Sequence, residues 1–176
     1  MKIIMFALIS VLVCMGLNAK EFEQGILFGV PIMNFERDKD SFSGFDVGFF
    51  QNRIYSNNII NSFKLEFNKT SWTDKSKEQV KKVHRTQLEG LFKIGYAIPK
   101  ILKIGFRPQI GVGTSLELNT GKFESVIPVV FGTEMNFGNR FQLGVDYKSN
   151  LNDFVKVNPK GSFVYRFSVL VWESSK

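Results

Sequence analysis

The chain has 176 residues, a formal net charge of +7, 44% hydrophobic residues and a single cysteine. This length suits one domain, and one cysteine excludes a disulfide framework. The sequence contains no Cys/His spacing typical of zinc sites, no glycine-rich phosphate loop and no Gly-x-Ser-x-Gly elbow. We therefore expect no catalytic site, no metal site and no cofactor.

Residues 1–19 have the pattern of an export signal. Lys2 makes the start basic, a long apolar run follows, and Ala19 offers a small residue for cleavage. The run is shorter than the about 20 residues that a transmembrane helix needs. We predict a signal peptide over 1–19 and one folded domain over 20–176, whose mature form lacks the cysteine.

From residue 22 onward, apolar side chains recur at every second position, which is the period of a β-strand. The alternation defines eight segments: 22–35, 44–55, 59–72, 83–96, 102–118, 124–137, 140–149 and 162–172. The longest, 102–118, exceeds the about 5–6 residues of an ordinary strand, and a tilted strand needs about 9–11 residues to cross a bilayer. The predicted fold is all-β: an eight-stranded antiparallel up-and-down transmembrane β-barrel.

Two positions interrupt this alternation. Phe49 and Phe50 are adjacent aromatic residues, so one of them breaks the pattern of its segment. Pro108 lies within the longest segment and has no N–H to donate to a neighbouring strand. We expect a β-bulge or a change of register at both places.

The connections between the segments alternate in length. Those after the second, fourth and sixth segments are tight, at 56–58, 97–101 and 138–139. Those after the first and seventh are longer and polar, at 36–43 and 150–161, and the third spans 73–82. Only the fifth, at 119–123, is short although it lies on the same side. Bacterial outer-membrane barrels have short periplasmic turns and longer outer loops. We therefore expect both ends of the chain in the periplasm.

Glycine indicates which face of the strands points inward. Only Gly90 falls on the apolar face, and ten glycines share the polar face: Gly25, Gly29, Gly44, Gly48, Gly95, Gly105, Gly111, Gly113, Gly132 and Gly144. Small residues make room inside a narrow eight-stranded barrel, whereas a solvent-facing surface gives glycine no packing reason. We expect the polar face inside. The alternative is a secreted lipocalin-like ligand carrier, in which the apolar face would be inside.

Aromatic residues near the segment ends resemble the two interfacial girdles of a spanning barrel. We assign these to Phe22, Tyr55, Tyr96, Phe137 and Phe141 toward the tight turns, and to Phe35, Trp72 and Phe163 toward the long loops.

The inward face carries nearly balanced charge. The predicted polar network of the lumen consists of Asp46, Glu66, Glu89, Arg107, Glu134, Asp146 and Arg166, accompanied by Glu117, Lys64, Arg85, Lys93, Lys103 and Lys148. Enclosed charges need partners, because desolvation costs several kcal/mol for each unpaired ion. We expect a salt-bridged plug, since eight strands leave no open channel. An ion path gated by rearranging pairs is the alternative.

A basic cluster lies in the connection after the third segment and at the start of the fourth segment. Lys75, Lys77, Lys81, Lys82 and Arg85 are the candidate contacts for lipopolysaccharide phosphates. An anionic membrane surface is the expected partner of this basic chain, and nucleic acid is not, because an exported protein rarely meets it.

His84 is the only histidine of the chain, and Thr86 follows on the same, outward face. Enzymes that edit lipid A use a histidine base beside a hydroxyl nucleophile. The neighbouring outward positions Leu116 and Leu118 offer no carboxylate to orient an imidazole. We therefore expect no enzyme, and keep a lipid-A-modifying enzyme as the alternative.

With its alternating segments, export signal and unequal loops, the region 22–172 resembles the small outer-membrane barrel proteins of Gram-negative bacteria, such as outer membrane protein X and the barrel of outer membrane protein A. The resemblance is architectural, since no specific motif carries it. It implies a non-enzymatic, porin-like protein of the outer membrane, with a structural or surface-interaction role, that is a monomer in contact with lipid and lipopolysaccharide.

The resemblance also implies a terminal aromatic residue that the barrel-assembly machinery reads. The last aromatic residue here is Trp172, and the alternation favours Val171 as the outward neighbour.

Overall fold

The computed structural model describes residues 19–33, 39–74, 81–101, 104–119, 121–138, 140–154 and 161–175. Its elements are β1 (Ala19–Met33), β2 (Lys39–Tyr55), β3 (Ile59–Asp74), β4 (Lys81–Tyr96), β5 (Ile98–Ile101), β6 (Ile104–Asn119), β7 (Lys122–Val126), β8 (Pro128–Phe137), β9 (Phe141–Asn150), the one-turn helix α2 (Leu151–Phe154) and β10 (Gly161–Ser175). The predicted signal peptide lies outside the described residues apart from Ala19, as do Phe35 and Lys103.

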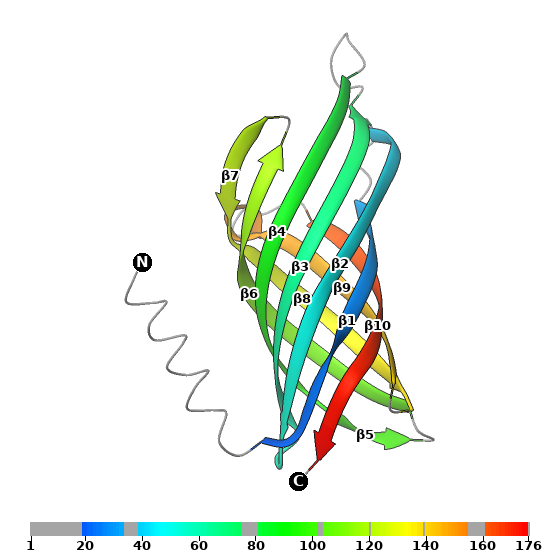
Figure 1. Cartoon of the computed structure of the whole chain (residues 1–176). Coiled ribbons are helices and arrows are strands. Elements are labelled where there is room, and N and C mark those ends of the chain that lie inside the picture. Colours follow the sequence, from blue (N-terminus) through cyan, green and yellow to red (C-terminus); the bar gives the residue numbers. More distant parts are fainter. Residues whose placement is uncertain are drawn as a thin grey trace.

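The strands pair in the order β4-β3-β2-β1-β10-β9-β8-β6, and pairing of β4 with β6 closes the ring (Figure 1). Every pairing is antiparallel. The short strands β5 and β7 both pair with β6 and continue β4 and β8 respectively, after breaks at Ala97 and Ile127. The ring therefore has eight staves, which confirms the eight-stranded up-and-down barrel.

The tight turns lie at one end of the barrel together with both ends of the described chain (Figure 1). Asn58 and Gly138 have φ values of 63° and 61°, which close the hairpins β2–β3 and β8–β9. The predicted turn over 97–101 is different, because most of it is strand β5, which forms a hairpin with β6. We call this end of the barrel the turn end and the opposite one the loop end.

The predicted irregularity at Phe49 and Phe50 is wrong. Both flanking ladders run through this pair without a shift, so Phe50 points inward and is 1% exposed. It lies directly opposite Gly25, where a Cβ atom would come within 2.5 Å of Phe50 Cε1. An aromatic residue fits on the inner face because its neighbour has no side chain.

The predicted bulge at Pro108 is also wrong. The ladder between β6 and β8 passes through the pair Pro108–Thr133 in constant register. On the other side, β6 pairs with β4 up to Gln109 and resumes with β5 at Phe106, which is the same register. The proline thus lies where the ladder is interrupted, so its missing N–H removes no pairing.

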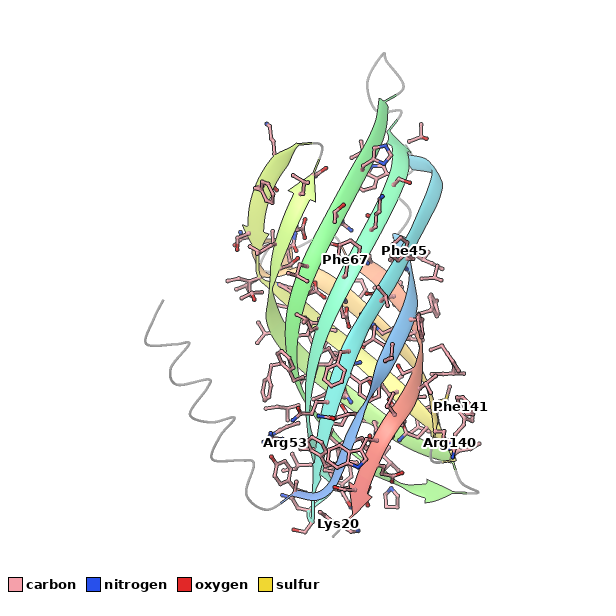
Figure 2. All side chains as sticks on the ribbon, in the orientation of Figure 1. Lys20, Phe45, Arg53, Phe67, Arg140 and Phe141 are labelled. Atoms are coloured by element: carbon pink, nitrogen blue, oxygen red, sulfur yellow. The ribbon has the colours of Figure 1, made fainter. Side chains whose placement is uncertain are left out.

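The barrel is apolar outside and polar inside. Large apolar side chains such as Phe28, Leu65 and Ile110 are 52%, 46% and 52% exposed on the outer face, and most buried residues are polar or charged. Figure 2 shows Phe45, Phe67 and Phe141 directed away from the barrel. A lipocalin-like carrier requires the reverse arrangement, so that alternative is wrong. Among the described residues, no helix is long and apolar enough to cross a membrane.

Two aromatic residues near strand ends differ from the prediction. Trp72 is 7% exposed and faces the interior, so it does not belong to an outer girdle. Trp172 is 57% exposed, because a register shift between β1 and β10 at Gln24/Gly25 turns it outward, where its ring packs against Phe22 at 5.6 Å. Val171 is 70% exposed, as the alternation predicts, and Trp172 is exposed as well, so the preference for Val171 over Trp172 does not hold.

Candidate functional site

The charged side chains of the inner faces meet in the lumen and form two groups of ion pairs. The first lies toward the turn end and joins β1 to β6, which are four staves apart in either direction around the ring. Arg107 donates two hydrogen bonds to Glu23, from Nη1 to Oε2 at 2.6 Å and from Nη2 to Oε1 at 2.7 Å. Both side chains are about 4% exposed. Asn52 and Gln142 donate further hydrogen bonds to Glu23 at 3.1 Å and 3.3 Å.

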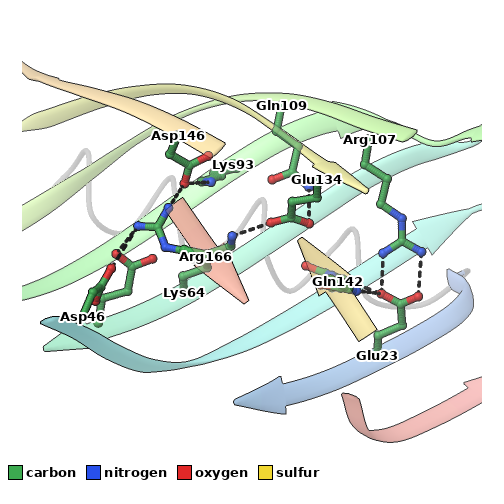
Figure 3. A network of polar contacts seen from close by, with 12 residues as sticks. Glu23, Asp46, Lys64, Lys93, Arg107, Gln109, Glu134, Gln142, Asp146 and Arg166 are labelled. Atoms are coloured by element: carbon green, nitrogen blue, oxygen red, sulfur yellow. Dashed lines mark hydrogen bonds and ion pairs between the residues drawn. The ribbon is translucent and has the colours of Figure 1, made fainter. Parts of the chain in front are cut away.

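Glu134 extends this turn-end group toward the middle of the barrel. It accepts hydrogen bonds from Lys64 of β3 and, at 3.1 Å, from Gln109 of β6. Figure 3 shows Arg107 and Glu134 directed into the same interior space from neighbouring strands. Both residues belong to the predicted network of the lumen, whereas Glu23 does not, although it has the same parity as the inward Gly25.

The second group, which we call the central charge group, contains Asp46, Glu66, Glu89, Asp146, Lys93, Lys148 and Arg166. Arg166 of β10 is its hub: it bonds to Asp146, donates from Nη2 to Glu66 Oε2 at 2.6 Å, and lies 3.3 Å from Asp46 Oδ2 (Figure 3).

Two lysines complete the central charge group. Lys93 of β4 bonds to Asp146 of β9. Lys148 of β9 donates to Glu66 of β3 at 2.5 Å and also bonds to Glu89 of β4. These partners belong to staves that are not neighbours in the ring, so the side chains cross the lumen and fill it. Breaking a buried ion pair is strongly destabilising, because it leaves a charge without a partner. The side chains of the central charge group are therefore held in one arrangement.

Glycines on the inner face make room for these side chains. Gly132 lies directly opposite Asp146, where a Cβ atom would overlap Asp146 Oδ1 and lie 2.8 Å from its Cγ. Gly111 lies opposite Lys93, and a Cβ there would come within 2.6 Å of Lys93 Cγ. Gly90, on the outer face, has no such neighbour within 4.0 Å. At Gly111 and Gly132, the absence of a side chain thus makes room for the network residue directly opposite.

The predicted phosphate contacts at the loop end are placed only in part. Lys75 and Lys77 lie outside the described residues, and Lys81 and Lys82 begin β4 with side chains that are not described. Arg85 faces the interior, with its guanidinium carbon 5.7 Å from the centre of the Trp72 ring. Arg85 thus lies on the inner face, and its contact with phosphate stays a prediction, as do those of the four lysines.

Lys69 is an outward cation that sequence analysis missed. It is exposed on β3 and lies directly opposite Thr86 of β4. Its parity with the apolar Leu65 and Phe67 places it on the outer face, two positions beyond the last phenylalanine of that strand. This parity was the signal that could have identified it.

His84 is exposed on the outer face of β4 and pairs across the ladder with Ser71 of β3. Thr86, whose hydroxyl is the candidate nucleophile from the sequence, lies two positions further along β4. Among the described outward positions around His84, which are those of Lys69, Ser71, Thr73, Thr86 and Leu118, none carries a carboxylate.

An acidic trio, Glu21, Glu23 and Glu173, lies at the turn end, where carboxylate oxygens of the three residues come within 4.8 Å of one another. Arg107 neutralises Glu23, and Lys20 Nζ lies 3.9 Å from Glu21. The proximity of these acids is therefore accounted for by ion pairs.

Comparison with known proteins gives similarity of fold. No protein-family model matches the chain, and no curated protein matches it. Similar solved structures include the outer membrane enzyme PagL, with 13% identity and a TM-score of 0.49, covering 86% of this chain and 99% of that chain. The Yersinia pestis outer membrane protein Ail has 14% identity and a TM-score of 0.48, covering 84% and 98%. The β domain of the Bordetella autotransporter BrkA has 9% identity and a TM-score of 0.37, covering 86% and 99%.

At these identities the assignment of the fold rests on the strand pairing of this chain and on the distribution of its side chains. Eight antiparallel staves close into a ring, charged residues fill the interior, and large apolar residues cover the exterior. The chain has the fold of an eight-stranded up-and-down transmembrane β-barrel.

Proposed function

We propose that this protein is an integral outer-membrane barrel without enzymatic activity, with a structural or surface-interaction role. The observation that carries the proposal is the pairing of an apolar exterior with a lumen filled by ion pairs. A continuous apolar exterior far exceeds the few hundred Å² that a soluble monomer tolerates. Lipid is the medium that accommodates such a surface, and a filled lumen leaves no room for an open channel.

The expected orientation puts the turn end in the periplasm and the loop end outside the cell, as is usual for bacterial barrels. Lys20, Arg53 and Arg140 lie toward the turn end (Figure 2). Arg53 lies 6.0 Å from the centre of the Phe22 ring, an arrangement suited to an interface between apolar and polar layers.

The proposed contacts of lipopolysaccharide phosphates are Lys69 and the predicted basic residues Lys75, Lys77, Lys81 and Lys82. The outward Trp172 is the proposed aromatic signal for the barrel-assembly machinery, and the barrel is proposed to be monomeric.

Cell fractionation tests the membrane assignment. The protein should co-sediment with outer membranes, resist extraction by salt and run differently on gels before and after boiling, because closed barrels stay folded in detergent. A soluble monomer after a salt wash, or identical mobility of boiled and unboiled samples, would contradict the proposal.

Planar-bilayer recording tests the plug. Because the ion pairs fill the lumen, the conductance of the barrel should be far below that of a porin. A stable conductance of porin size would overturn the plugged lumen and favour the ion path as the function.

A lipid-A-modifying enzyme is the second candidate, and the position of Ser71 directly opposite His84 favours it, because a hydroxyl and an imidazole then share one outer face. Lipid A from cells with the wild-type protein, with His84→Ala and with a deletion should have identical mass spectra if the barrel is not an enzyme. A lipid A species that depends on His84 would replace the leading proposal.

A further inference from the structure

The central charge group does not balance. Among the described residues that its ion pairs connect, four carboxylates share three cations, which leaves one negative charge: Asp46, Glu66, Glu89 and Asp146 against Lys93, Lys148 and Arg166. Arg85, the next cation along β4, lies over the Trp72 ring, and Glu117 accepts a hydrogen bond from Gln87. Counting these two opposite charges as well leaves the excess of one negative charge unchanged.

Asp46 is the carboxylate with the weakest compensation. It is 2% exposed, and neither of its carboxylate oxygens accepts a hydrogen bond from the described residues. Its ion pair is the 3.3 Å contact with Arg166, whose Nη2 is already bonded to Glu66 at 2.6 Å. Glu66, Glu89 and Asp146 each accept at least one hydrogen bond from a cation. The excess negative charge is therefore concentrated at Asp46.

Two uncharged oxygens without partners adjoin this carboxylate. Asn68 of β3 lies directly opposite Asp46 in the ladder, and Thr70 follows two positions further on the same inner face. The side chains are 6% and 1% exposed, and neither Asn68 Oδ1 nor Thr70 Oγ1 has a hydrogen-bond partner within the described part of the chain. Opposed residues of an antiparallel pair have Cβ atoms about 4.5–5.5 Å apart, and diagonal neighbours are within about 7–8 Å. Three buried oxygen ligands therefore face a common space.

We propose that Asp46, Asn68 and Thr70 form a binding site for a single hard cation inside the barrel. A carboxylate, an amide oxygen and a hydroxyl are ligands of hard cations, which prefer oxygen and retain water in the remaining positions. The excess of one negative charge selects a monovalent ion such as sodium or potassium, because a divalent ion would leave an excess positive charge. Thr70 is the ligand nearest the loop end, from which an ion would enter. This site goes beyond the proposed function and does not depend on what the barrel contacts outside.

The test is the thermal midpoint for loss of the unboiled gel mobility, measured on the refolded protein in detergent. Sodium, potassium or calcium chloride is titrated at constant ionic strength against choline chloride. An ion that binds only the folded state stabilises it by an amount that grows with the logarithm of its concentration above the dissociation constant. We expect the midpoint to rise with sodium or potassium in the wild-type protein and to remain flat with choline.

Two isosteric variants remove the ligands one at a time. Asp46→Asn should fold without added sodium or potassium, because it neutralises the excess charge, and should lose the response to these ions; Thr70→Val should need a higher concentration for the same shift. The matched control is Ser115→Ala, which removes another partnerless buried oxygen opposite Glu89 and should keep the wild-type response.

An equal response in Asp46→Asn, or no response of the wild-type protein to any of the three cations, would overturn the site. A midpoint that follows pH alone would assign the missing positive charge to a proton on Asp46 and would also overturn it. A response to calcium but not to sodium or potassium would overturn the monovalent assignment. Should Asp46→Asn not fold, anomalous scattering from crystals grown in rubidium chloride decides: a peak between Asp46 and Asn68 supports the site, and no peak there overturns it.

Discussion

Arg107 and Glu23 form a two-bond ion pair across the barrel, although three staves lie between β6 and β1 on either side. No ladder of backbone hydrogen bonds connects these two strands, so the pair links opposite walls directly. With the contacts of the central charge group, it makes the lumen a packed interior.

Glu23→Gln should destabilise the barrel strongly, because it leaves the guanidinium of Arg107 buried with too little compensation. Breaking a buried pair on one side typically costs about 3–5 kcal/mol. The measurement is the free energy of unfolding in urea for the protein in detergent. Glu21→Gln is the control, since the Lys20–Glu21 pair is partly exposed, with side chains 57% and 28% accessible, and such pairs contribute about 0–1 kcal/mol. Equal losses in the two variants would show that the cross-barrel pair does not hold the walls together.

Gly132→Ala should disrupt the central charge group, because the new methyl group would displace the carboxylate of Asp146 from Lys93 and Arg166. Overpacking of a filled interior typically costs about 1–3 kcal/mol. The matched control is Gly90→Ala on the outer face, where the nearest atom to the added methyl group is Thr114 Oγ1 at 4.0 Å, and its effect should be small. The thermal midpoint for loss of the unboiled gel mobility is measured for both variants. A Gly132→Ala variant with the midpoint of the wild-type protein would refute the packing role of the glycine.

Phe50→Ala should be far more costly than Phe49→Ala, because Phe50 fills the interior beside Gly25 whereas Phe49 is 42% exposed on the outer face. Removing a buried phenylalanine typically costs about 3–5 kcal/mol, including the cavity that remains. Urea unfolding in detergent measures both losses. The opposite ranking would mean that the strand has the other phase at this point, as a bulge between the two residues would produce.

Leu65→Lys should destabilise the barrel in a lipid bilayer by about 2–4 kcal/mol, because a lysine on the lipid face near mid-membrane is expensive. Leu65 is 46% exposed in the middle of β3. The control is Leu151→Lys in α2 at the loop end, where Leu151 is 39% exposed and the change should cost little. Folding into vesicles of increasing lipid concentration checks this, and full tolerance at Leu65 would argue against a membrane-facing outer surface.

Much of the fold follows from local alternation. The period of two predicts eight staves, their antiparallel order and the inward direction of Asp46, Glu66 and Glu134, because side chains of a strand point alternately to its two faces. The same parity applies to Glu23 and Trp72, which are inward, and its consistent use would have placed both correctly. Both residues lie near strand ends. There, a residue can belong either to an outward aromatic girdle or to the filled lumen, and its type alone does not distinguish the two.

The sequence by itself thus determined the number of strands, their faces and the charged character of the lumen. The tertiary structure alone decided which charges meet. Arg107 reaches Glu23, and Arg166 serves three carboxylates, because ring closure brings strands far apart in the chain to opposite walls of one narrow space. It also decided that Pro108 and Phe50 fit without a bulge. Pro108 lies where the ladder is interrupted, and Phe50 lies opposite Gly25, which has no side chain. Alternation is a property of one strand, whereas pairing across a lumen depends on register and closure, which no single strand encodes.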